Sequence, residues 1–216
     1  MRIRATLLHM AESEIKKIIP PYVMDDIKQK DPKPLFRAYV VGQEGQAEAN
    51  WVGVGKLVKT WFASAIGSIV KKLWPGLKIF HNHSETNEHE GRTQIGEVAG
   101  SKASIIDDKT SAIAVAYIYP EYRELPLDVA SIEVEVNIDP TIPDGVHADD
   151  VADVTGIALG NSKVNRPGFP GATLLGELQA MAEKSGIGHE IPKKFKLGYS
   201  LNNTDQQDKL ELVEEA

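Results

Sequence analysis

The strictest alternation of apolar and polar residues lies in Ile-Glu-Val-Glu-Val-Asn-Ile, residues 132–138. A period of two residues is typical of a β-strand with one buried and one solvated face. The pattern therefore predicts a half-buried strand with Ile132 facing the core and Glu133 and Glu135 facing solvent. Ser131 lies where this strand begins.

Shorter apolar runs predict further strands. They are residues 2–8, 35–42, 77–80, 95–106, 111–119 and 153–160. Two of them are joined by Asp107-Asp108-Lys109-Thr110, a polar sequence that predicts the turn of a hairpin.

Apolar residues recur at steps of three and four between Gly55 and Leu73, which predicts a helix that ends before Pro75-Gly76. A second helix is predicted over 172–184, and a short one over 11–19, before Pro20-Pro21. The polar segments 25–34 and 43–50 are expected to be loops. The sum is an α+β fold, a mostly antiparallel β-domain with two or more packed helices.

Length and composition limit the classes of protein to which this chain can belong. The chain of 216 residues predicts one domain over 1–185 and a polar, acidic tail or linker over 186–216. The net charge of -7 argues against a nucleic-acid partner. The absence of cysteine excludes disulfides and thiolate chemistry. No apolar run approaches the roughly 20 residues of a membrane span, so we expect a soluble, cytosolic protein.

Candidate chemistry concentrates between Lys78 and Val98, where His81, His83 and His89 occur in a polar, acid-rich stretch. The strand predicted over 77–80 would deliver the first two histidines to its end. Imidazole at such a site serves either proton transfer or metal binding.

Two kinds of site remain open from spacing alone. A metal site would use His81, His83 and His89, with Glu85 as a further ligand. A serine hydrolase site would combine Ser131 with a histidine and a later carboxylate. Serines at strand ends and histidines in polar loops are also common without any catalytic role.

Four sequence segments occur in an order that is similar to the order of motifs in a known protein family. Asn82-His83 at a strand end is followed by Ile-Gly-Glu-Val at 95–98, by Ala-Ser-Ile-Glu-Val at 130–134 and by Asp-Val-Thr-Gly-Ile-Ala-Leu at 153–159. A Pro- and Gly-rich turn comes next. Over roughly 57–184 the chain resembles the tailed-phage prohead (capsid maturation) serine proteases, whose fold is similar to herpesvirus assemblin.

The resemblance implies catalytic roles. His83 would be the general base, Ser131 the nucleophile and Asp153 the acidic third member. His147, Glu133 and Glu135 are alternatives to Asp153, and His81 replaces His83 if the strand register differs by two residues. No cofactor or metal is implied.

The resemblance also implies a fold and a setting. The core would be an antiparallel, barrel-like sheet, and an extended peptide would enter as an added strand beside Ser131. The expected protein is a serine endopeptidase of phage head maturation. It would cleave capsid and scaffold proteins and also its own chain. It would act as a homo-oligomer inside the assembling prohead in the host cytoplasm. The alternatives are a non-catalytic capsid-assembly module of the same fold and a His-centred, metal-dependent hydrolase.

Overall fold

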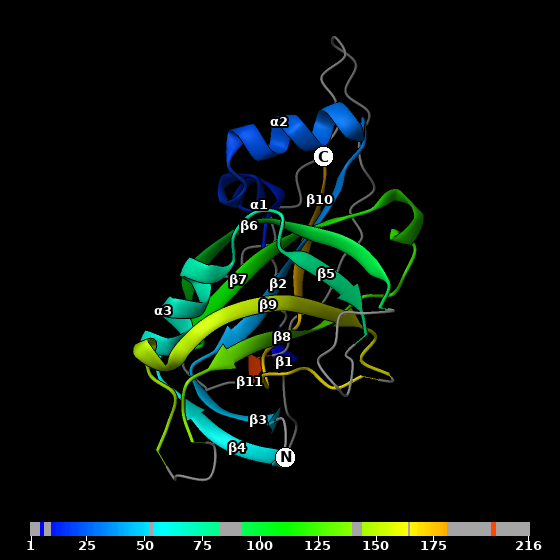
Figure 1. Ribbon diagram of the computed structural model, residues 1–216. Coiled ribbons are helices and arrows are strands. Elements are labelled where there is room, and N and C mark those ends of the chain that lie inside the picture. The colour runs from blue at the N-terminus through cyan, green and yellow to red at the C-terminus, as the bar shows by residue number, and fades with distance from the viewer. Residues whose placement is uncertain are drawn as a thin grey trace.

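The computed structural model describes residues 5–6, 10–51, 54–82, 92–139, 144–163, 165–180 and 200–201. Within these ranges the chain forms three α-helices, one seven-stranded sheet and two two-stranded sheets (Figure 1). The prediction of an α+β fold is confirmed. No helix in the described ranges is long and apolar enough to cross a membrane.

The large sheet is mixed. Every neighbouring pair is antiparallel except β5 and β9, which run parallel. In spatial order its strands are β10 (Leu174–Gln179), β2 (Leu35–Gln43), β7 (Lys109–Ile118), β6 (Gln94–Ile106), β5 (Lys78–His81), β9 (Val151–Gly160) and β8 (Val129–Val136).

The remaining elements surround this sheet. The two-stranded sheets pair β3 (Gly45–Trp51) with β4 (Gly55–Trp61), and β1 (Ala5–Thr6) with β11 (Ser200–Leu201). The helices are α1 (Glu12–Ile18), α2 (Pro21–Lys30) and α3 (Ala63–Lys72), and the 3₁₀ turns are η1 (Pro120–Tyr122) and η2 (Ala148–Asp150).

The core lies on both faces of the sheet, because alternate residues of the central strands go to different sides. Phe36 and Val40 of β2 pack in the cluster that contains α1 and α2. Tyr39 and Val41 of the same strand pack in the cluster that contains α3. This explains why residues 36–42 are buried without interruption, as expected for a strand covered on both faces.

The two edges of the large sheet meet at one place. Val129, the first residue of β8, forms an antiparallel bridge with Thr173, which precedes β10. The amide of Ala130 also donates to the carbonyl of Ala172 at 3.0 Å. The turn that leads into β10 therefore runs beside the start of β8, next to Ser131.

Several predicted elements are confirmed. The strands predicted at 35–42, 77–80, 132–138 and 153–160 correspond to β2, β5, β8 and β9, and α1 lies within the predicted helix 11–19. β8 ends at Val136, two residues before the predicted end. The hairpin of β6 and β7 turns at Asp107 and Asp108, whose φ angles of 51° and 59° suit a two-residue hairpin turn. Of the predicted first strand only Ala5–Thr6, and of the predicted tail only Ser200–Leu201, lie among the described residues.

The helix predicted over Gly55–Leu73 is wrong in its first third. Residues 55–61 form β4, and the helix begins only after Phe62, whose φ and ψ of -83° and 156° are extended. Most of the polar segment 43–50, expected to be a loop, belongs to the strand β3, which pairs with β4. Val58 is consequently 59% exposed instead of buried on a helix face.

Two more predicted elements are wrong. The segment predicted as a helix over 172–184 contains the strand β10, because its leucines suit both periods and β2 offers an edge to pair with. The segment 25–34, expected to be a loop, continues α2 as far as Lys30. Pro21 occupies the first turn of α2, where its missing N–H costs nothing.

Candidate functional site

Ser131 lies on the edge strand of the large sheet, on the face opposite α3. It pairs with Ala158 of β9, which in turn pairs with Phe80 of β5. Its neighbours Ala130 and Ile132 belong to the α3 cluster, so alternation directs Ser131 and Glu133 to the other face. Ser131 is half-buried there.

Small residues lie on both sides of Ser131. Ala158 is its partner across the strand pair, and Gly168 packs from the loop that precedes β10. A Cβ atom at Gly168 would come within 2.7 Å of Ser131 Oγ, so only glycine permits this approach. The Gly168 amide donates to the Ala130 carbonyl at 3.1 Å and holds the loop in place.

A buried ion pair lies on the same face as Ser131. Arg92 Nη1 donates to Glu133 Oε1 at 2.6 Å, and the two side chains are 8% and 2% exposed. Glu133 was predicted to face solvent, and that prediction is wrong because Arg92 covers it. Burial of this carboxylate is tolerated because a charged donor contacts it directly.

Arg92 contacts two further groups beyond the carboxylate. Its Nη2 donates to the backbone carbonyl of Asn82 at 2.9 Å. Its guanidinium carbon lies 4.2 Å from the centre of the Phe80 ring, in a cation–π contact. One side chain thus joins β8 to the end of β5 and to the residue that follows it.

The candidate histidines are placed only in part. His81 ends β5, and alternation puts it on the same side as Ile79, which packs in the α3 cluster on the face opposite Ser131. His83, the predicted base, lies outside the described residues, as do Glu85 and His89. The described chain reaches Asn82, whose amide donates to Leu159 O at 2.8 Å, and Leu159 pairs with Ala130.

The structure does not bring Asp153 to Ser131. Asp153 pairs with Glu135, four residues farther along β8, which places it on the order of 13 Å away. It is exposed, and its Oδ1 accepts a hydrogen bond from the Val154 amide at 2.8 Å. Glu135 is exposed at the same level of the strand pair.

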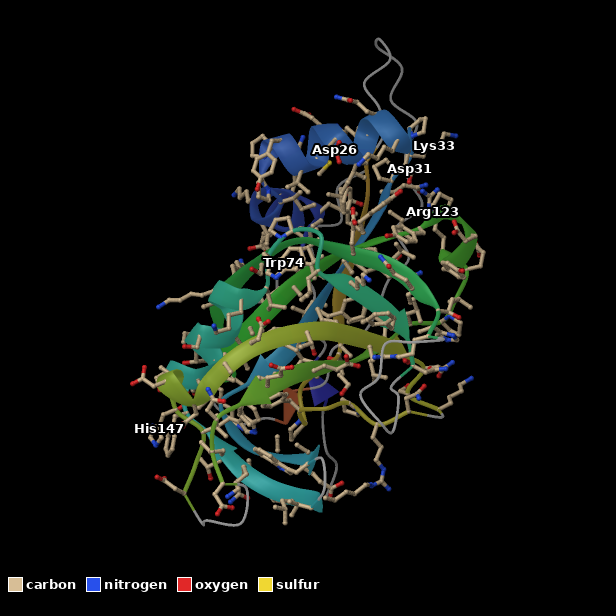
Figure 2. The ribbon with its side chains drawn as sticks, in the orientation of Figure 1. Asp26, Asp31, Lys33, Trp74, Arg123 and His147 are labelled. Atoms are coloured by element: carbon tan, nitrogen blue, oxygen red, sulfur yellow. The ribbon has the colours of Figure 1, made fainter. Side chains whose placement is uncertain are left out.

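His147 lies at the opposite end of β9 from Ser131, just before η2 (Figure 2). Its ring stacks on that of Phe62 with centroids 4.3 Å apart. Its Nε2 is 3.8 Å from Asp144 Oδ1. Among the four proposed carboxylate and histidine partners, Glu133 is therefore the one nearest to Ser131 along the strands, two residues away on the same face of β8.

The metal alternative finds no support in the described ranges, where no three side chains of His, Asp or Glu are grouped to hold an ion. Two of its three histidines, His83 and His89, lie outside those ranges.

Sequence reasoning missed Arg92, Phe80 and Gly168. Arg92 stands in a polar stretch that resembles a solvated loop, and nothing in its neighbours marks it as buried. Gly168 belongs to the Pro- and Gly-rich segment that the resemblance includes, but its contact with Ser131 depends on the fold. Comparisons of the chain with family models, with curated proteins and with solved structures found no match.

Proposed function

We propose that the protein is a serine endopeptidase of the tailed-phage prohead type, with Ser131 as its nucleophile. The observation that carries the proposal is the setting of Ser131. It is a half-buried serine on an edge strand between Ala158 and Gly168, and Asn82, the residue before His83, follows β5 and donates to Leu159 of β9, the strand that pairs with β8. The order of motifs that resembles this family supports the same assignment.

In the proposed reaction Ser131 Oγ attacks the scissile carbonyl while His83 accepts its proton. His83 then returns that proton to the leaving amine, and water releases the acyl group by the same two steps. We assign the acidic role to Glu133 and not to Asp153, because Glu133 lies two residues from Ser131 on β8 whereas Asp153 pairs with Glu135, four residues along the strand.

The proposed substrate is an extended segment of a capsid or scaffold protein. β8 is the last strand of the large sheet, and in the described ranges the backbone contacts on its outer side are confined to its start, where Gly168, Ala172 and Thr173 lie beside Val129 and Ala130. The backbone of Ile132 faces the same outer side by alternation. An incoming strand can therefore add to β8 next to Ser131, using main-chain hydrogen bonds for affinity.

The bridge between Val129 and Thr173 supports the finer proposal that the sheet curls into a barrel-like core of the assemblin type. We further propose that the enzyme works as a homo-oligomer within the assembling prohead, and that it requires neither metal nor cofactor.

The test is incubation with the cognate capsid and scaffold proteins, followed by intact mass spectrometry. Wild type should produce defined fragments in the presence of chelator, and Ser131→Ala should produce none. Ser104→Ala is the matched control, because Ser104 is also a half-buried serine within a strand. Cleavage by none of the three proteins would favour the non-catalytic assembly module.

A further inference from the structure

We propose that Arg92 is a positioning residue, which holds the backbone carbonyl of Asn82, the residue before His83, at a fixed place relative to the strand of Ser131. This inference rests on the proposed function and names a residue that the catalytic roles above leave unused.

The contacts of Arg92 point in two directions. Nη1 donates to Glu133, two residues after Ser131 on β8. Nη2 donates to the carbonyl of Asn82, which belongs to the same peptide group as the nitrogen of His83. The two distances, 2.6 Å and 2.9 Å, are those of well-formed charge-assisted hydrogen bonds. One rigid fork therefore sets the spacing between β8 and the backbone carbonyl of Asn82.

The backbone at Asn82 requires such support. Its φ of 62° lies in the left-handed region, where β5 ends and the chain changes direction. Asparagine adopts this conformation more readily than most residues, but it still needs neighbouring contacts to fix it. The Asn82 amide donates to Leu159 and its carbonyl accepts from Arg92, so both of its backbone groups are tied to the surrounding structure.

Lysine cannot replace arginine in this role. The planar guanidinium contacts the carboxylate and the carbonyl with separate nitrogens, and its carbon also lies over the face of Phe80. A lysine ammonium is a compact point charge with a different reach, so Arg92→Lys keeps the charge near Glu133 and loses the bridge.

The chain contains a matched pair for comparison. Arg37 and Glu177 form another buried ion pair, with side chains 9% and 10% exposed. They lie opposite each other on β2 and β10. Arg37 also donates to the carbonyls of Arg123 and Leu125. Breaking this pair costs stability without touching the strand of Ser131.

The experiment measures the rate at which an alkyl fluorophosphonate modifies Ser131, followed by mass spectrometry. In this reaction the Ser131 Oγ–P bond forms, the P–F bond breaks, the serine proton goes to the base and fluoride leaves. The probe needs no knowledge of the substrate. Wild type, Arg92→Ala, Arg92→Lys, Arg37→Ala and Ser131→Ala are compared at a temperature where circular dichroism shows each of them folded.

We expect both Arg92 variants to react at least about tenfold more slowly than wild type, because small displacements of a base are costly to rate. Arg37→Ala should react within about twofold of wild type even though its melting temperature falls. Millimolar guanidinium should partly restore the rate of Arg92→Ala. If Arg92→Ala does not fold, the rate of Ser131 modification in Arg92→Lys tests the inference.

The outcomes separate the two proposals. No modification of Ser131 in wild type would overturn the proposed function and this inference together. Modification of Arg92→Lys at the wild-type rate would overturn the inference and leave the function standing. Equal slowing in Arg37→Ala would show that the loss reflects general destabilisation, which also overturns it.

Discussion

Replacing Gly168 by alanine tests the geometry around Ser131 most directly. The added Cβ would lie 2.7 Å from Ser131 Oγ, 3.2 Å from its Cα and 3.3 Å from its Cβ. The first distance is roughly 0.7 Å short of ordinary contact between nonbonded atoms. The loop cannot withdraw without losing the hydrogen bond from the Gly168 amide to Ala130. Either that hydrogen bond breaks or the Ser131 side chain adopts another rotamer.

The expected cost is that of overpacking, about 1–3 kcal/mol of unfolding free energy. In a chain of this size each kcal/mol lowers Tm by about 2–4 °C. Displacing Oγ by a comparable fraction of an ångström should also slow phosphonylation of Ser131 by roughly tenfold or more. Calorimetry and the fluorophosphonate assay measure the two effects separately.

The control is Gly67→Ala in α3, where the new Cβ would meet nothing within 4 Å. That variant should gain about 0.5–1 kcal/mol, because alanine restricts the unfolded chain and favours helix, and its labelling should not change. The double variant Ser131→Ala, Gly168→Ala should recover part of the lost stability, since Oγ is the nearest atom. Unchanged Tm and labelling in Gly168→Ala would refute the packing described for this loop.

Three further predictions concern other parts of the molecule. Glu133→Gln should slow phosphonylation of Ser131 while Asp153→Asn stays within about twofold of wild type, and the reverse order would restore Asp153 as the acidic member. Burial raises the pKa of Tyr117, whose hydroxyl donates to Asp31 at 3.0 Å. The folded state therefore retains this proton, so the stability it supplies is complete below about pH 10 and is lost as pH rises further. Tm measured against pH should fall less steeply in Tyr117→Phe, and identical slopes would contradict this. Ile69→Ala in fully buried α3 packing should cost about 2–5 kcal/mol in urea unfolding, and a cost below 1 kcal/mol would contradict the assigned core.

The sequence predicted strands well where burial and alternation agree. The hairpin of β6 and β7 and the strand β9 follow directly from apolar runs and a polar turn. The prediction from sequence failed where the spacing of the apolar residues is compatible with both a helix and a strand. In β10, Leu174 joins the cluster of α3 and Leu175 joins the cluster of α1 and α2, a division that a helical spacing does not reveal.

The candidate site shows the same limit. Alternation correctly indicates that Ser131 and Glu133 share one face of a strand, but it does not say what covers that face. Arg92 covers Glu133 on that face, although it precedes Glu133 by 41 residues in the chain. Gly168 approaches from the other direction through a turn whose course depends on the bridge between Val129 and Thr173. Both contacts are tertiary, so local pattern carried no signal for them.

The two buried ion pairs of the large sheet share one construction. In each, an arginine contacts a carboxylate on another segment and also donates to a backbone carbonyl outside the strands: Arg92 to Asn82, and Arg37 to Leu125. Buried ion pairs contribute little net stability compared with apolar packing of the same volume, because desolvation offsets most of the attraction. Their value here is geometric, since each fixes a connecting segment against a strand. For Arg37 that segment is the connection from β7 to β8, and for Arg92 it is the backbone that continues to His83. Because Arg92 fixes the backbone at Asn82 and Arg37 fixes a connection elsewhere, the comparison of these two residues separates the positioning of that backbone from a general loss of stability.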